Sequence, residues 1–218
     1  MRRLSLLLVP VLVTSALLTG SATARTAKAT KTWRVTITNS TSAQPLSPPL
    51  FAVHSNQADV WSVGSVASPG VAAIAEDADN SVLTAELAGV PGVYSVQTGA
   101  GDPIPPGASR TYSVQTRGSF NRVTVLTMLV NTNDAFTGLD SFHVTGKGAT
   151  LAKAAYDAGS ERNNELATHI PGPCCGNPFV RDPTSEPIHM HPGILGVGDL
   201  APAVYDWTNP VATIAISR

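Results

Sequence analysis

The sequence predicts an all-β protein, an antiparallel β-sandwich with one or two short helical insertions. Three observations carry this prediction. Glycine and proline supply 18 and 17 of the 218 residues while charged residues reach only 13%, a composition that suits short strands joined by many turns. Residues 32–38 alternate strictly, which puts Trp33, Val35 and Ile37 on one face of a half-buried strand. Residues 210–217 alternate in the same way near the end of the chain, and no internal repeat divides the sequence.

Further strands are predicted where apolar or alternating residues run between turn signals. They fall at residues 50–54, 93–97, 110–116, 122–131, 136–144 and, as a short strand, 189–191. Residues 158–188 have little periodicity and many Gly, Pro and Asn residues, so a long irregular loop is expected there.

Two short helices are predicted between the second and third strands. Ser68 is suited to cap the first helix, and Pro69 fits its first position because the missing N–H would be unpaired there anyway. Asn80 or Ser81 is suited to cap the second helix, which Gly89 would stop.

The N-terminus has the pattern of a secretory signal peptide. Arg2 and Arg3 precede an almost wholly apolar stretch at residues 4–18, and small residues follow with an Ala-x-Ala site ending at Ala24. A transmembrane anchor needs about 20 apolar residues, more than this stretch contains. We therefore expect a signal peptide at residues 1–24, a disordered leader at 25–31, and one secreted domain at 32–218.

The charge balance limits the partners of the secreted domain. Removing Arg2 and Arg3 with the signal lowers the basic residues from 14 to 12, against 15 acidic ones. This balance argues against nucleic acid and against attraction to an anionic membrane. No second hydrophobic segment of spanning length follows the signal, so no membrane span is expected in the mature chain.

Three acidic residues form the most suggestive group for binding. Asp157 and Glu161 are four residues apart around a turn at Gly159, and Asp134 lies at the junction of a strand and a loop. Calcium takes six to eight oxygen ligands, which mix carboxylates with backbone carbonyls, and crowded carboxylates without a cation would repel each other. The alternative is three solvated loop acids that never meet.

A second candidate metal site rests on His189 and His191, which point to the same face if residues 189–191 form a strand. A transition metal such as copper or zinc could use both imidazoles, with His54 or His169 as a third ligand. The alternative is a pair of histidines with hydrogen-bond partners near a sheet edge.

Cys174 and Cys175 are the two cysteines of the chain. Outside the cell they would form a vicinal disulfide, remain two free thiols, or link to another molecule. The vicinal disulfide is favoured because exposed thiols are a liability in an exported protein. The sequence contains no Gly-x-Ser-x-Gly motif, no phosphate-binding loop and no His-Glu-x-x-His motif.

An ordered set of short motifs spans nearly the whole mature chain. It comprises residues 33–39 (WRVTITN), 44–49 (QPLSPP) with His54, 75–79 (AEDAD), 127–136 (TMLVNTNDAF), 138–140 (GLD), 155–159 (AYDAG) and 191–194 (HPGI). In these motifs the chain resembles the spondin N-terminal domain, in the form found in bacterial secreted proteins.

The resemblance implies a C2-like β-sandwich with a calcium site made by three acidic side chains. Carried over position by position, these fall on Asp134, Asp157 and Glu161, although the family often has Asp at the last position. The resemblance thus favours a secreted, calcium-binding interaction or adhesion-type module without catalysis, which binds an extracellular or envelope protein or glycan. The competing hypothesis is a secreted copper or zinc enzyme that uses His189 and His191.

Overall fold

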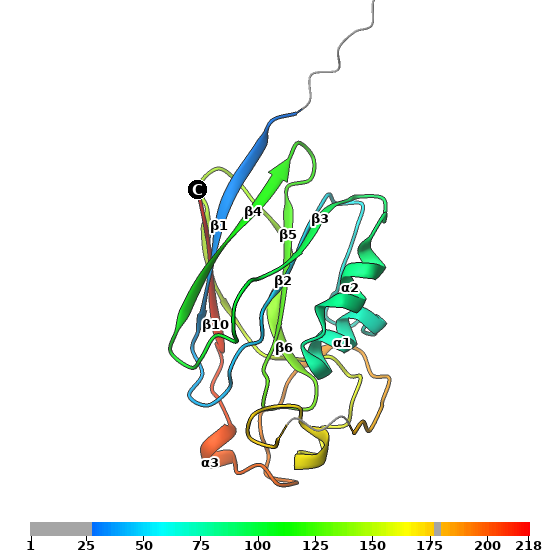
Figure 1. Ribbon diagram of the computed structural model, residues 1–218, viewed down its shortest axis with the longest axis vertical. Helices are drawn as coiled ribbons and strands as arrows, with labels where there is room; N and C mark the ends of the chain where they lie inside the picture. The colour runs from blue at the N-terminus through cyan, green and yellow to red at the C-terminus, as the bar shows by residue number, and fades with distance from the viewer. Residues whose placement is uncertain (1–27, 177–179) are drawn as a thin grey trace, which may run out of the picture.

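Two antiparallel sheets packed face to face make up most of the computed structural model, which describes residues 28–176 and 180–218 (Figure 1). One sheet has four strands in the order β4-β1-β10-β7, and the other has six in the order β3-β2-β5-β6-β8-β9. The predicted all-β sandwich is therefore confirmed. The strands are β1 (Thr30–Asn39), β2 (Leu50–His54), β3 (Val93–Thr98), β4 (Ser109–Arg117), β5 (Arg122–Met128), β6 (Ala135–His143), β7 (Ala149–Lys153), β8 (Tyr156–Asp157), β9 (His189–Met190) and β10 (Ala212–Ser217).

The alternation in the first strand places its apolar residues in the core between the sheets. Trp33, Val35 and Ile37 are at most 2% exposed, while β1 pairs with β4 on one side and β10 on the other. The strand starts at Thr30, so it includes the last two residues of the segment that was expected to be a disordered leader. The predicted signal peptide, its cleavage site after Ala24 and residues 25–27 lie outside the described residues.

Two helices cover the outer face of the six-stranded sheet (Figure 1). They are α1 (Pro69–Asp77) and α2 (Asn80–Leu87). Alternate residues of β2 face opposite ways, so Phe51 and Val53 join the core between the sheets while Leu50 and Ala52 pack under the helices. A strand buried on both faces has a continuous apolar run in its sequence. Each large side chain buried in it stabilises the folded state by roughly 1.5–3 kcal/mol.

The helix starts follow the chemistry of their caps. Ser68 accepts a hydrogen bond from the Val71 amide at the start of α1, as predicted. The second helix is capped one residue earlier than expected, because Asp79 accepts from the Ser81 amide. Asn80 instead donates its side-chain amide to the carbonyl of Pro48.

One strand ends earlier than predicted, and four short elements were not predicted. Strand β5 ends at Met128 rather than at residue 131, because Thr132 closes a turn by donating to the Leu129 carbonyl and accepting from the Ala135 amide. The unpredicted elements are β7, β8 and the one-turn helix α3 (Pro202–Tyr205), together with a 3-10 turn at Ala167–His169.

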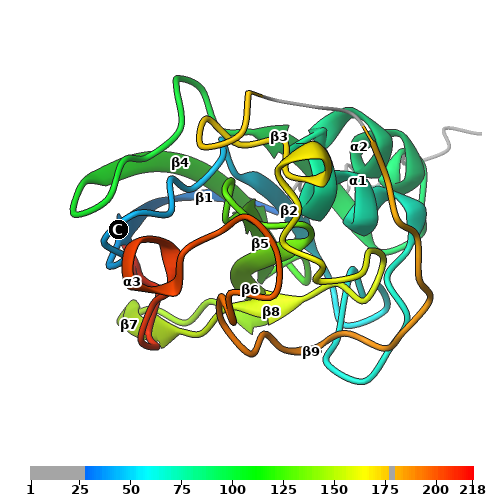
Figure 2. The ribbon, with the colours of Figure 1, turned by 90° about the horizontal axis from the view of Figure 1, so that it is seen from below.

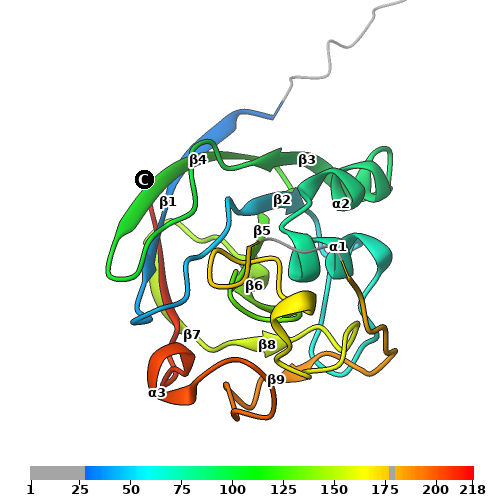
Figure 3. The same ribbon diagram turned by 60° about the horizontal axis from the view of Figure 1, so that its bottom comes forward.

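The loops gather at one end of the sandwich. Viewed from that end, the segments around β8, β9 and α3 and the long loop after β8 lie together across it (Figures 2 and 3). A small cluster of Ile170, Ile194 and Leu200 fixes these loops, with Tyr205 and Trp207 packed against it. No helix within the described ranges is long and apolar enough to cross a membrane.

Gly138 lies where β6 passes closest to β5, opposite Leu126. A Cβ added at this glycine would overlap the backbone carbonyl of Val125. We therefore predict that Gly138→Ala destabilises the domain by about 2 kcal/mol or more, lowering the melting temperature by roughly 4 °C or more.

Gly146→Ala is the matched control, because a Cβ there meets nothing within 4 Å. Its free energy of unfolding should stay within about 0.5 kcal/mol of the wild-type value. Thermal or denaturant unfolding of both variants checks this, and equal melting temperatures for the two would contradict the packing of β6 on β5.

Candidate metal centre

The pairing of β6 with β8 brings two of the predicted site residues together at the loop end. Ala135 pairs with Asp157, and the backbone carbonyl of Asp134 accepts the Ala158 amide at 3.2 Å. Asp134 thus lies immediately before β6, beside the last residue of β8. The strand pairing, rather than any closeness in sequence, brings these two acidic residues near each other.

Asp134 is fully buried and only half of its carboxylate is satisfied. Its Oδ2 accepts hydrogen bonds from the Ser160 amide at 2.9 Å, the Ser160 hydroxyl at 3.2 Å and the Glu161 amide at 3.0 Å. Its Oδ1 is buried and has no hydrogen-bond partner. Burial, followed by the negative charge of Asp157, raises the pKa of Asp134 from 3.8 to about 7.

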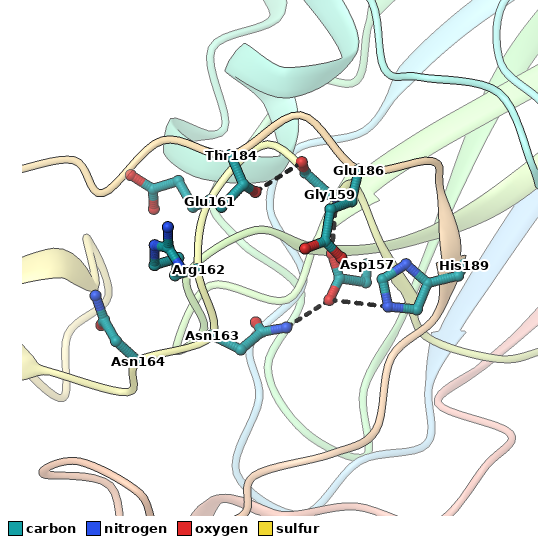
Figure 4. Close-up of a pocket in the computed structure, with 9 residues that line it drawn as sticks. All are labelled: Asp157, Gly159, Glu161, Arg162, Asn163, Asn164, Thr184, Glu186 and His189. Atoms are coloured by element: carbon teal, nitrogen blue, oxygen red, sulfur yellow. Dashed lines mark hydrogen bonds and ion pairs between the residues drawn. The ribbon is translucent and has the colours of Figure 1, made fainter.

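Asp157 is 2% exposed and is held by the turn that follows it. Its Oδ1 accepts the Gly159 amide at 2.7 Å, and its Oδ2 accepts the side-chain amide of Asn163 (Figure 4). The turn requires glycine, because Gly159 has a φ of +68° and a Cβ there would overlap the Glu186 carbonyl. His189 Nε2 lies 3.6 Å from Asp157 Oδ2.

Glu161 is also buried, but its carboxylate turns away from Asp157 (Figure 4). Neither carboxylate oxygen has a hydrogen-bond partner. Arg181 Nε lies 3.5 Å from Glu161 Oε1, and Arg181 also pairs with Glu76 at 3.4 Å and with Asp77. One guanidinium is therefore shared among three carboxylates.

The electrostatic surroundings of Glu161 disfavour its ionised form. Burial, followed by the charge of Glu76 and, more weakly, those of Asp134 and Asp182, raises the pKa of Glu161 from 4.5 to about 8. Asp134, Asp157 and Glu161 lie near one another, but their carboxylates do not converge on one point. Within the described ranges, no group of three or more His, Cys, Asp or Glu side chains has the geometry to hold a metal ion.

The histidines do not form the three-ligand site that was considered from the sequence. In the strand register His54 lies opposite Arg122, and Arg122 lies opposite His143 at the end of β6. His189 lies opposite Asp157, which in turn lies opposite Ala135 at the start of β6. The length of β6 separates these two places, about 26 Å at roughly 3.3 Å per residue. His54 is buried with both ring nitrogens bonded, one to the Ser55 carbonyl and one to the Thr124 hydroxyl, each at 2.8 Å.

His189 and His191 differ in surroundings, because β9 ends at Met190. The side chain of His189 is 48% exposed. His191 is buried, and its Nδ1 accepts the Gly193 amide at 3.0 Å, so its Nε2 carries the proton and faces Asn163 Oδ1 at 3.1 Å. Burial lowers the pKa of His191 to about 4. Both nitrogens of His191 are therefore engaged within the protein.

Cys174 and Cys175 form a disulfide between adjacent residues, which is one of the three states the sequence left open. The pair packs against the cluster of Ile170, Ile194 and Leu200. Asn131 Oδ1 accepts the Cys174 amide at 3.2 Å, so this loop is attached to the turn that precedes Asp134. The disulfide is thus part of the loop end but not of the acidic group.

An open hollow of about 360 Å³ lies beside the acidic residues, lined by Asp157, Glu161, Asn163, Glu186, His189 and their neighbours (Figure 4). Sequence reasoning missed Asn163, Ser160 and Arg181 as contributors to this site. Ser160 and Asn163 flank Glu161 in the chain, so a search for polar side chains near the predicted ligands would have found them. Arg181 is 20 positions from Glu161, and no local pattern indicates it.

Fold and site together define a two-sheet β-sandwich domain with buried carboxylates at its loop-bearing end. The Spondin_N family model matches residues 36–162, more than half of the chain, and the chain belongs to the spondin N-terminal domain family. The match includes Asp134, Asp157 and Glu161 and ends before Cys174 and His189. This family is extracellular, in keeping with the predicted export. A comparison with curated proteins gives no match.

The raised pKa of Asp134 makes the stability of the metal-free protein depend on pH. Between about pH 4 and pH 7 the carboxyl of Asp134 is protonated in the folded state and ionised in the unfolded chain, so its contribution makes the free energy of unfolding fall as the pH rises. The lowered pKa of His191 acts in the opposite direction. Asp134→Asn should reduce the fall in the free energy of unfolding between these pH values by up to about 4 kcal/mol.

Thermal unfolding with a chelator between pH 4.5 and 7.5 checks this prediction. Asp102→Asn is the control, because Asp102 is exposed and should leave the pH dependence unchanged. An Asp134→Asn protein with the same pH dependence as the wild type would contradict the unfavourable burial of this carboxylate.

Proposed function

We propose that this domain is an extracellular, calcium-binding interaction module without catalytic activity. The observation that carries the proposal is the buried carboxylate of Asp134, whose Oδ1 has no hydrogen-bond partner and whose pKa is raised by burial and by the charge of the nearby, buried Asp157. Two buried like charges are unfavourable unless protonated or neutralised. Above neutral pH, a divalent cation between them would supply the neutralisation.

The chemistry of the available donors favours a hard cation. Asp134, Asp157 and Glu161 offer carboxylate oxygens, and calcium is bound by oxygens in flexible arrangements. Neither buried oxygen of Glu161 accepts a hydrogen bond, and Oε1 lies in an ion pair with Arg181. A side-chain rotation away from Arg181 would direct the carboxylate toward the other two acids. A copper or zinc site would need imidazole nitrogens, and those of His191 already have partners.

A cation at this place would connect segments that are distant in sequence. Asp134 precedes β6, Asp157 ends β8, and Glu161 begins the loop that pairs with residue 183. Binding to the folded state alone stabilises it by mass action. The loop end would then be rigid when calcium is abundant, which suits a surface that contacts an extracellular or envelope partner.

We predict that millimolar calcium raises the melting temperature. At a calcium concentration of 100 times the Kd, the stabilisation is about 2.7 kcal/mol, which corresponds to roughly 5–10 °C for a domain of this size. Asp157→Ala should remove most of the rise, whereas Asp102→Ala should keep it.

Calorimetric titration with calcium, zinc and copper separates this proposal from the enzyme hypothesis. One calcium ion per chain, lost in Asp157→Ala, is the expected result. Stoichiometric zinc or copper that is lost in a His189→Ala/His191→Ala double variant would support the metalloenzyme instead. No thermal shift with calcium in the wild-type protein at pH 8 would refute the proposal.

A further inference from the structure

The charges of the molecule are unevenly distributed between the two ends of the sandwich. The ion pairs of the described residues involve Arg162, Arg181 and His189, all in the loop that follows β8 or at the start of β9. The opposite end carries cations without such partners among the described residues, and five of them lie on or beside the four-stranded sheet. This basic end consists of Lys28, Lys31, Arg34, Arg117 and Lys147.

The basic end is formed by adjacent strands of the four-stranded sheet. Thr30 pairs with Arg117, and Arg34 pairs with Ser217 near the end of β10. Lys147 belongs to the turn before β7. The next residue of that turn, Gly148, lies close to the carbonyl of Ile216 in β10. The start of β1, the end of β4 and the C-terminus lie together at this end (Figure 1).

Four of the five side chains are exposed, and Arg117 is half-buried. None of them forms a salt bridge with an acid in the described part of the chain. Cations held close together without compensating acids repel one another and attract a polyanion. The basic end is therefore a surface with a clear charge preference.

Two neighbouring hollows at this end contain no acidic residue in their walls. One, of about 330 Å³, is lined by Lys28, Lys31, Thr116 and Asn121 among others. The second, of about 280 Å³, is lined by Asn56, Ser119, Asn121, Arg122 and His143. Asn121 lines both, so the two hollows adjoin, and amide, hydroxyl and cationic groups lie along their walls beside the apolar side chains of Ala29, Trp33 and Val144 in the first.

The surroundings of the basic end favour a hydrated ligand over a lipid bilayer or stacked bases. The exposed large apolar side chains of the described residues lie at positions 63–66 and 166–204, outside the basic end. These two segments meet beside β9, where the Gly64 amide donates to the Ile188 carbonyl. Trp33 lines the first hollow, but it is only 2% exposed and Arg218 lies over its ring, so little of the ring is open to stacking. The adjoining outer face of the sheet presents hydroxyls, with Thr36 bonded to Thr111 at 2.8 Å.

We propose that the basic end binds an anionic polysaccharide, through contacts of the five cations with its carboxylate or sulfate groups. This inference rests on the proposed role of the domain as an interaction module and names the class of its partner. It does not depend on the calcium site, which lies at the other end of the sheets.

Binding of the mature protein to dextran sulfate and to polygalacturonate tests the proposal, with uncharged dextran as the reference polymer. Lys28→Gln/Lys31→Gln/Lys147→Gln should weaken binding by about tenfold or more in 0.15 M salt and flatten its dependence on salt. The variant should keep the wild-type melting temperature and its shift with calcium.

Arg110→Gln/Lys153→Gln/Arg162→Gln is the matched control, because it removes three positive charges outside the basic end. It should bind the anionic polymers within about twofold of the wild type. Asp157→Ala should also bind them normally, with or without chelator, so that failure of the calcium proposal and failure of this one are distinguishable.

Three results would overturn the proposal. The wild-type protein could bind neither anionic polymer more tightly than uncharged dextran. The two triple variants could lose equal affinity, which would indicate a general charge effect. Finally, vesicles containing phosphatidylglycerol or duplex DNA could bind more tightly than both polysaccharides at the same salt concentration.

Discussion

The antiparallel pairing of β6 with β8 brings two buried acids, Asp134 and Asp157, near each other, and the loop end of the domain is organised around them. Asp134 receives three hydrogen bonds from Ser160 and Glu161, and Asp157 orders the turn at Gly159. These contacts connect the start of β6 to the loop after β8. The raised pKa of Asp134 shows that hydrogen bonds to one oxygen do not offset burial beside a second acid.

This arrangement gives the loop end two alternative states with different charge. A proton on Asp134 relieves the repulsion with Asp157, and under the proposed function a calcium ion would relieve it above the raised pKa. A cation that binds there would compete with protons, because binding requires the ionised carboxylates. The position of Arg181, shared among Glu161, Glu76 and Asp77, indicates that even the neighbouring acids are short of positive charge.

Much of the fold could be predicted from the sequence because its signals are local. The alternation around Trp33 identifies β1, the doubly buried run at residues 50–54 identifies β2, and Ser68 with Pro69 identifies the start of α1. Strands β7 and β8 were missed because they are short, and their pairing rather than their composition makes them strands. The closeness of Asp134 and Asp157 depends on that same pairing; their positions at turns and strand ends made it one of two alternatives, and the family resemblance favoured it. The orientation of Glu161 could not be predicted, because it depends on Arg181 from a distant segment.

The two ends of the sandwich offer different chemistry on one rigid scaffold. The loop end holds buried carboxylates, and the opposite end presents exposed cations beside a hydroxyl-bearing sheet face. An extracellular module of this kind can be stabilised at one end and make contacts at the other.

The structure of the protein crystallised with calcium at pH 8 tests the central claim most directly. The account predicts one calcium ion bound by oxygens of Asp134 and Asp157 at about 2.3–2.6 Å, with the Glu161 carboxylate turned toward it and away from Arg181. Well-ordered carboxylates at saturating calcium with no ion between them would contradict the account.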